Sequence, residues 1–223
     1  MFTNAAAIAE DGGPLQDKNH FYYRIFDQPN RTREEWLHYF FFNSNALCHP
    51  SVLLQWRCFE ECGHYRDGLY QLGDLDMWVR LCLRYPIHVL DEKLVRFRVR
   101  DHNANMSADT KDTRIRLDYE HVEIFQNYLT ISDPGELLAI FPEARKHHRS
   151  GKESEFDVPY LLAMVALEEP TLPSYKLCGL RVLFKLLNDP AGAGTLKHKY
   201  DLDAANFAAL TAKHEIFAIS HAP

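Results

Sequence analysis

The chain has 223 residues, 46% of them hydrophobic and 25% charged, and a formal net charge of −6 at pH 7. This composition supports a substantial folded core and excludes disorder of the whole chain. The negative charge, without a long basic run, provides no general attraction for phosphate backbones, so nucleic acid is not expected as a partner. Five cysteines at irregular spacing indicate free thiols in a reducing compartment rather than a disulfide framework.

The N-terminal segment MFTNAAAIAEDGG has no basic region before its apolar residues, which argues against a signal peptide. The most apolar run, WLHYFFF at 36–42, is far shorter than the ~20 residues of a membrane-spanning helix. No transmembrane segment is therefore expected. We predict a cytoplasmic protein, either free or peripheral to the inner face of the membrane.

The first segment with a clear pattern is Phe2–Ile8, a short apolar run ended by Glu-Asp-Gly-Gly-Pro. It indicates a buried strand that runs into a turn. Further along, Thr32 with Glu35 three residues later forms a capping-box pattern that predicts the start of a helix over 33–42.

The sequence pattern between residues 46 and 86 predicts two more helices. The segment 46–55, ALCHPSVLLQ, is short and β-like around Pro50, and RCFEECG after it indicates a helix closed by Gly63. After a loop, we predict a helix from Asp74 to Tyr85, ended by Pro86. Its apolar residues recur at the helical period: Leu75, Trp78, Val79, Cys82 and Tyr85.

Two β-like segments follow, at 87–90 and 94–100. The second alternates apolar and basic residues, which is typical of a half-buried strand. After Asn105 the pattern changes to successive helices, predicted at 110–131, 134–149, 157–168, 174–188 and 203–219. We therefore expect a boundary near residue 108, with an α/β domain at 1–108 and a helical extension at 109–223.

The order of features from Cys48 to Ser107 resembles family 2 glycosyltransferases of the GT-A fold. The run begins CHPSVLLQWRCFEECG, continues with the acidic and tryptophan-bearing stretch GDLDMWVRL, and ends in the Arg-rich segment LVRFRVRDHNANMS. In the family, such segments form the acceptor side, with the last one on a hairpin. The resemblance implies a partial GT-A α/β sandwich at 1–108, followed by the all-helical C-terminal region.

The resemblance also implies an activity, the transfer of a sugar from a nucleotide-sugar donor to a glycan or lipid-linked acceptor. Such an enzyme uses Mg²⁺ or Mn²⁺, held by an Asp-x-Asp turn. Because FTNAAAIAEDGG looks like the strand that follows that turn, we expect the donor-binding half outside this chain, and the sequence leaves open whether the chain is active alone. We assign no metal ligand here. The triplets at 74–76 and 201–203 lack the expected context, and Cys58 and Cys62 match no zinc pattern.

Asp74 aligns with the second acid of the family's Glu-Asp pair, which implies that it is the catalytic base. A partly buried carboxylate can take the proton of an acceptor hydroxyl. Gly73 stands where the first acid usually lies, a departure from the family pattern. The alternative is structural: Asp74 would cap the helix while Asp76 and Arg80, four residues apart, pair on its solvent side.

His49 and Trp78 are candidate acceptor-binding residues. Trp78 could stack on a sugar or fill the core at the helical period, and His49 could contact the acceptor or be a hydrogen-bonded buried residue. By the same resemblance, Arg98, Arg100 and His102 would contact the leaving diphosphate. Alternate arginines on a strand are also explained by a solvent-exposed face.

A different class of function remains open at this point. The α/β part could be a relic, with the helical region from about residue 110 acting as a non-catalytic interaction protein. An unpaired edge on the first strand would also allow self-association.

Overall fold

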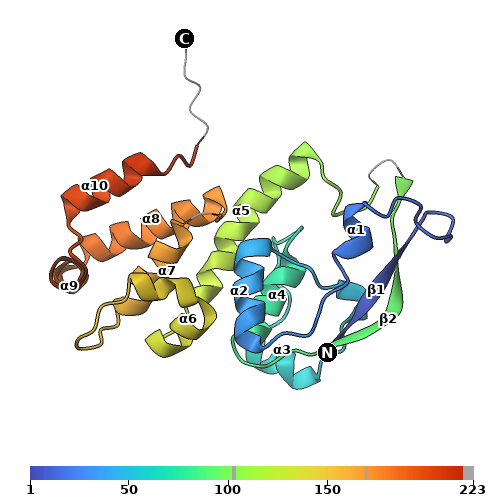
Figure 1. Cartoon of the computed structure of the whole chain (residues 1–223), viewed down its shortest axis with the longest axis horizontal. Helices are drawn as coiled ribbons and strands as arrows, with labels where there is room; N and C mark the ends of the chain where they lie inside the picture. The colour runs from blue at the N-terminus through green and yellow to red at the C-terminus, as the bar shows by residue number, and fades with distance from the viewer. Residues whose placement is uncertain (102–103, 169, 218–223) are drawn as a thin grey trace, which may run out of the picture. The chain divides into compact units, whose positions relative to one another are not determined.

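The computed structural model describes residues 1–101, 104–168 and 170–217. The chain divides into two compact units, Met1–Glu120 and His121–Pro223, whereas the sequence predicts a boundary near residue 108. Within the described residues the chain is mixed α/β, with two strands and mainly helices otherwise (Figure 1). The helical character of the second half agrees with the sequence prediction.

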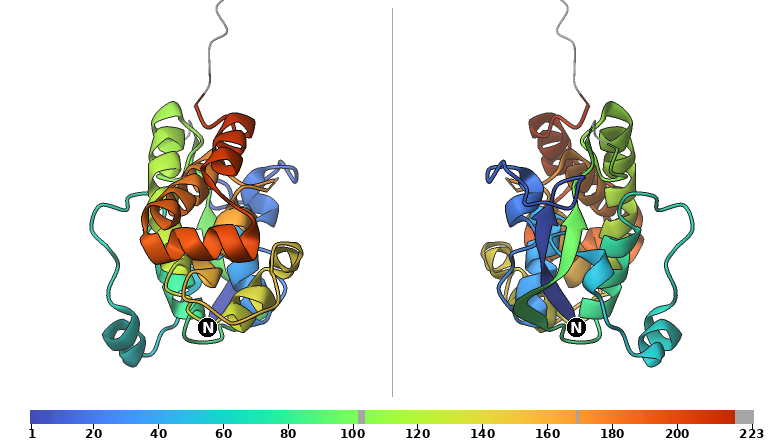
Figure 2. Two further views of the ribbon diagram at one scale, coloured as in Figure 1. Left: turned by 90° about the vertical axis from the view of Figure 1, so that its left-hand side faces the viewer. Right: turned by 90° about the vertical axis from the view of Figure 1, so that its right-hand side faces the viewer.

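The first unit contains a two-stranded parallel sheet. Strand β1 (Phe2–Ile8) pairs with β2 (Val89–Arg98), with register shifts on both sides of Asn4. The right-hand view of Figure 2 shows the two strands side by side. The prediction of β1 is confirmed. The two β-like segments at 87–100 are instead one continuous strand, so the expected hairpin does not form among the residues described.

The predicted alternation along β2 is confirmed. Val95 and Phe97 are half-buried, and Arg96 and Arg98 are exposed; the same alternation continues past the end of the strand to Val99 and Arg100. Phe97 packs against Tyr22 and Phe26, with ring centroids 4.8 and 4.9 Å away. On the other side of β1, Thr3 N–H donates to Ser51 Oγ at 3.2 Å. Part of the outer edge of β1 is therefore occupied.

Two helices supply most of the core of this unit. Helix α2 (Arg33–Asn43) begins with the predicted capping box between Thr32 and Glu35. Helix α4 (Gly73–Cys82) buries almost every residue after its first turn, and the Trp78 ring meets Phe2 edge-on at 4.7 Å. Burying a large apolar side chain contributes about 1.5–3 kcal/mol. Packing between α2, α4 and β1 therefore stabilises this unit.

Two of the segments between these elements differ from the sequence prediction, and one agrees with it. Residues 46–55 form no strand: Ser51 N–H bonds to the Cys48 carbonyl, and the turn η1 (His49–Ser51) results. Pro50 favours this turn because its nitrogen has no hydrogen to donate to a ladder. Helix α3 (Trp56–Cys62) ends, as predicted, at Gly63, whose φ is +79°. A four-residue helix, α1 (Phe21–Arg24), was not predicted.

Asp76 and Arg80 form an ion pair, but its location corrects the prediction of a solvent-side pair. The Asp76 side chain is fully buried, and its Oδ2 accepts from Arg80 Nε at 2.8 Å. Arg80 also donates to the backbone carbonyls of Cys62 and His64. Arg66 contacts the other carboxylate oxygen at 3.1 Å. The pair lies under the loop after α3 because helical periodicity alone does not say which side a loop covers.

The second unit consists of short helices. Helix α5 (Lys111–Tyr128) begins in the first unit and ends in the second. It is followed by α6 (Pro134–Ile140), η3 (Pro142–Lys146), α7 (Asp157–Ala166), α8 (Pro173–Asn188), α9 (Pro190–Tyr200) and α10 (Ala204–Lys213). The predicted helix at 134–149 is thus broken at Pro142. Helix α9 was missed because its glycines mask the helical pattern.

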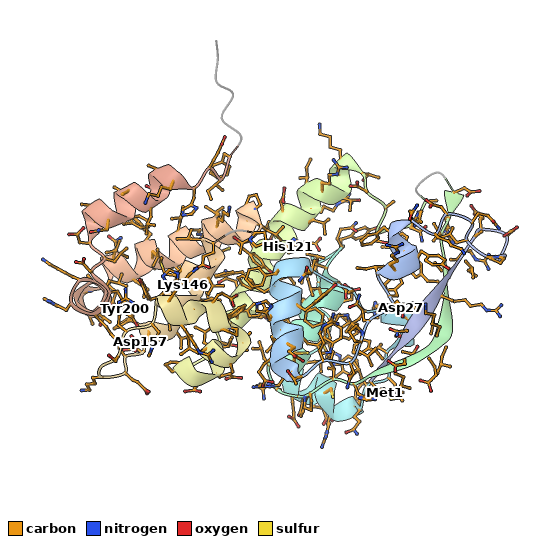
Figure 3. The ribbon with its side chains drawn as sticks, viewed as in Figure 1. Met1, Asp27, His121, Lys146, Asp157 and Tyr200 are labelled. Atoms are coloured by element: carbon orange, nitrogen blue, oxygen red, sulfur yellow. The ribbon has the colours of Figure 1, made fainter. Side chains whose placement is uncertain are left out.

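A buried polar cluster joins α7 to α9. Asp157 Oδ1 accepts from the Tyr200 hydroxyl at 2.6 Å, and Oδ2 accepts from Lys199 Nζ at 2.7 Å. Figure 3 labels Asp157 and Tyr200, which lie near one another. These bonds and the Lys199 charge lower the pKa of Asp157 despite its burial. Since the carboxylate is paired on both oxygens, the cluster stabilises the packing of the two helices.

Helices α7 and α8 approach each other at Gly179. A Cβ atom added there would lie 2.8 Å from the Ala163 carbonyl oxygen and 3.2 Å from the Ala166 Cβ. A side chain of any size would therefore push the two helices apart. Gly194 in α9, by contrast, has no atom within 4 Å of such a Cβ.

We therefore expect Gly179→Ala to lower the free energy of unfolding by about 1–3 kcal/mol through overpacking. Gly194→Ala should raise it by about 0.5–1 kcal/mol, because alanine loses less backbone entropy in a helix. Urea unfolding followed by circular dichroism measures both. Equal effects of the two substitutions would contradict the close approach of α7 and α8.

Candidate functional site

The loop before α4 is held in place by a residue far along the chain. The Glu120 side chain on α5 is only 2% exposed, and its carboxylate accepts three consecutive backbone N–H groups. The distances are 2.9 Å from Tyr70, 2.8 Å from Gln71 and 2.6 Å from Leu72. A charged acceptor with several backbone donors makes strong bonds. Glu120 thus fixes the entry of the chain into α4.

This arrangement decides the capping alternative for Asp74. The N-cap of α4 is Leu72, which makes no side-chain capping bond, and Asp74 is the second helical residue. Asp74 is therefore not the N-cap, but its Oδ1 accepts from Leu75 N–H at 2.7 Å, so the expected bond to a backbone N–H of the first turn is present. The Glu120 carboxylate binds the N–H groups just before the helix. No local spacing in the sequence pointed to Glu120, because its partners lie about fifty residues earlier.

Replacing Glu120 by Gln should destabilise the protein. The amide presents N–H groups to backbone donors, so at least one buried N–H loses its acceptor, at a cost of about 1–3 kcal/mol. The exposed Asp118 lies two residues earlier on the same helix and is the matched control. Asp118→Asn should change the free energy of unfolding by less than about 0.5 kcal/mol. Indistinguishable urea midpoints for the two variants would contradict this role of Glu120.

Asp74 is held half-buried by a second partner. Its Oδ2 accepts from Asn45 Nδ2 at 2.7 Å, while Asn45 Oδ1 accepts from Leu47 N–H at 2.9 Å. The two bonds give the Asn45 amide one orientation, with its donor toward the acid. Burial raises the pKa of Asp74 above its usual 3.8, against the opposing effects of the Leu75 N–H, His49 and Asn45. Asp74 is thus better suited to accept a proton than an exposed aspartate.

His49 lies beside this carboxylate, on the turn η1. Its charge acts on Asp74, and its Nε2 is 3.0 Å from the Tyr65 hydroxyl. Burial and the nearby Asp74 charge raise the pKa of Tyr65, so the phenol is kept protonated. The structure therefore brings a base, an exposed imidazole and a phenol together. Tyr65 was missed by sequence reasoning because it stands in a loop without periodicity.

Trp78 lies beneath this group rather than in it. The indole is fully buried, and the His49 ring meets it edge-on with centroids 5.5 Å apart. Neither face of the indole is available to a sugar, so stacking of an acceptor on Trp78 is corrected to a core position that supports His49. The core alternative stated for Trp78 is the one that the packing supports.

The predicted diphosphate-binding residues lie elsewhere in the first unit. Arg98 donates to the backbone carbonyls of Ala9 and Glu10, in the turn after β1. Arg100 lines a hollow of about 460 Å³ together with the side chains of His20, Tyr22 and Ser107. His102 lies outside the described residues. No hydrogen bond among the residues described connects Arg98 or Arg100 to Asp74.

The described residues contain neither a metal-ligand cluster nor a membrane-spanning helix. No group of three or more His, Cys, Asp or Glu side chains is placed to hold a metal ion in that part of the chain. No helix within it combines the length and apolar character needed to cross a membrane. The five cysteines are all free thiols, and burial raises the pKa of Cys48 to about 11.

The chain was also compared with known proteins. No protein-family model, no curated protein and no solved structure matches it. The chemistry of the site therefore rests on the residues themselves.

The raised pKa of Asp74 predicts a specific pH dependence of stability. Between pH 3.8 and the higher pKa of the folded state, the folded protein binds more protons than the unfolded one. The contribution of Asp74 to stability therefore falls as the pH rises through this window. In Asp74→Asn this contribution is absent, so the free energy of unfolding of the variant minus that of the wild type should increase with pH.

Urea unfolding of both proteins between about pH 3 and about pH 7 measures this difference. A difference that stays constant over the range would mean that the pKa of Asp74 is not raised. Asp118→Asn, which replaces an exposed acid, provides the control for general charge effects.

Proposed function

We propose that the unit Met1–Glu120 is the acceptor side of a family 2 glycosyltransferase, a portion of a GT-A α/β sandwich, and that Asp74 is its catalytic base. One observation carries the proposal. The carboxylate of Asp74 is half-buried, and a hydrogen bond from Asn45 orients it. Burial raises its pKa, and it lies beside the exposed His49. The resemblance of residues 48–107 to the family assigns this acid the same role.

The reaction needs one proton acceptor at this position. An acceptor hydroxyl would give its proton to Asp74 as its oxygen forms a bond to the anomeric carbon of the donor sugar. The bond from that carbon to the nucleotide diphosphate breaks on the opposite face, which inverts the configuration. Each oxygen of Asp74 accepts one hydrogen bond already, from Leu75 and Asn45, and retains a further acceptor site.

Neighbouring side chains can hold the acceptor. The His49 imidazole and the Tyr65 phenol both carry groups that hydrogen-bond to sugar hydroxyls, and they are exposed at the same place. Their mutual contact and the buried Trp78 ring beneath His49 fix their orientation. We expect them to position the hydroxyl that reacts, which lowers the entropic cost of the transfer.

The leaving diphosphate is the second charge that the reaction must stabilise. The resemblance implies this role for Arg100, which is exposed and has a guanidinium with planar donors for phosphate oxygens; because Arg100 lines a hollow that does not include Asp74, we assign it no step of the reaction. A bound Mg²⁺ or Mn²⁺ would neutralise this group in enzymes of the family. Since the described residues place no set of three metal ligands together, we assign no step of the reaction to a cation.

The test is a transfer assay with the complete enzyme, in which the donor-binding half is present together with this chain. Nucleotide-activated hexoses, Mg²⁺ or Mn²⁺, and free or lipid-linked glycan acceptors are combined, and release of nucleoside diphosphate that depends on the acceptor is measured. Asp74→Asn should lower the rate about 10²- to 10⁴-fold because the proton acceptor is lost. Asp118→Asn should retain the wild-type rate, and circular dichroism should show both variants folded.

Two results would contradict the proposal. Turnover by Asp74→Asn at the wild-type rate would remove Asp74 from the mechanism. A complete assembly, with the donor-binding half present, that neither transfers a sugar nor gives heat on titration with nucleotide sugars would favour the non-catalytic interaction protein instead.

A further inference from the structure

A second hollow lies beside the loop that leads to Asp74. It has a volume of about 420 Å³ and an open mouth on the surface of the first unit. One wall is the loop at 68–70 and the other is one face of α5. Its lining consists of Gly68, Leu69, Tyr70, Arg116, Tyr119 and Glu120.

Two aromatic rings dominate this hollow. Tyr70 and Tyr119 are each 61% exposed, which is unusual for side chains of this size. The Arg116 guanidinium lies 5.2 Å from the centre of the Tyr70 ring, in cation–π contact. Exposed tyrosine faces are apolar surfaces with a polar edge, and the guanidinium adds planar hydrogen-bond donors.

The hollow is built on a fixed backbone. Glu120, which lines the hollow, is almost fully buried. Its carboxylate accepts hydrogen bonds from the backbone N–H groups of Tyr70, Gln71 and Leu72. Tyr119 precedes Glu120 on the same helix. A single carboxylate therefore sets the position of the Tyr70 backbone relative to α5, the helix that carries Arg116 and Tyr119, before any ligand binds.

The hollow is also close to the proposed base. Tyr70 precedes Asp74 by four residues, which limits the separation of their Cα atoms to about 14 Å for a fully extended chain. The start of α4 shortens that path: a Cβ added at Gly73 would lie 3.8 Å from the Leu69 Cβ.

We propose that this hollow is a carbohydrate subsite, in which the apolar face of a pyranose ring stacks on Tyr70 or Tyr119 and its hydroxyls accept hydrogen bonds from Arg116. The assignment rests on the proposed function in one respect: the sugar bound here would be the part of the acceptor beyond the unit that reacts at Asp74. Stacking matches a neutral sugar because every pyranose has an apolar C–H face, while its hydroxyls match the donors at the rim.

The test measures binding of soluble trisaccharides of glucose, mannose, galactose and N-acetylglucosamine to the whole chain by NMR titration. At least one of them should bind and shift the backbone amides of 68–72. Tyr119→Ala, Tyr70→Ala and Arg116→Ala should each weaken that binding about tenfold. Tyr119→Phe should retain most of it, because the ring remains.

Tyr23→Ala is the matched control, since Tyr23 is an exposed tyrosine that does not line the hollow. This variant should bind as the wild type does. The subsite is overturned if none of the trisaccharides binds the wild type, or if Tyr70→Ala and Tyr119→Ala bind as tightly as the control. Circular dichroism of every variant separates lost binding from lost folding.

Asp74→Asn distinguishes this proposal from that of the preceding subsection. Its trisaccharide affinity should equal that of the wild type, because Asp74 does not line the hollow. Saccharide binding by this chain, together with transfer by the complete enzyme that Asp74→Asn leaves unchanged, would retain the subsite and refute the base. Transfer that is abolished by Asp74→Asn but unchanged in KM for the acceptor by Tyr119→Ala would retain the base and refute the subsite.

Discussion

The entry of the chain into α4, the helix that carries Asp74, depends on the Glu120 carboxylate and the three backbone N–H groups that it binds. A helix start leaves several N–H groups without partners, and here the chain satisfies those just before α4 with a side chain from α5. The same contact fixes Tyr70 on one side and Asp74 on the other. A single non-local interaction thus sets the geometry of both the proposed base and the proposed subsite.

Two acids of the same helical turn have different environments and hence different roles. Asp76 is buried against the guanidinium groups of Arg80 and Arg66, which compensate its charge. Asp74 has only neutral hydrogen-bond donors, from Asn45 and Leu75, and burial raises its pKa. A carboxylate that is fully paired stabilises structure, whereas one that is desolvated and incompletely paired can accept a proton. Environment rather than spacing therefore separates the two.

The buried Asp76–Arg80 pair also explains why the loop after α3 is ordered. Arg80 donates to the carbonyls of Cys62 and His64, so the chain that carries Tyr65 is attached to α4. Tyr65 then meets His49, which rests on Trp78. Removing one member of a buried ion pair typically costs about 3–5 kcal/mol. The Asp76–Arg80 pair, which the sequence predicted on the solvent side of the helix, thus supports the position of the Tyr65 phenol beside the proposed base.

The sequence by itself determined the local elements. The capping box at Thr32 and Glu35, the stop at Gly63 and the alternation along β2 all depend on neighbouring residues, and all three are as predicted. It also singled out Asp74 and His49, which the structure places together. The prediction failed where residues that usually end a helix lie inside one. Helix α9, which contains two glycines, was missed for this reason.

Only the tertiary structure decided what each polar residue contacts. Glu120 binds amides about fifty residues away, Arg80 faces a loop rather than solvent, and Trp78 is sealed beneath His49. The strands β1 and β2 also pair across more than eighty residues. Periodicity records which face of an element is apolar, because that depends on the residue's own position in the helix or strand. Periodicity does not identify the residue or element that this face contacts, because the packing of the whole unit selects it.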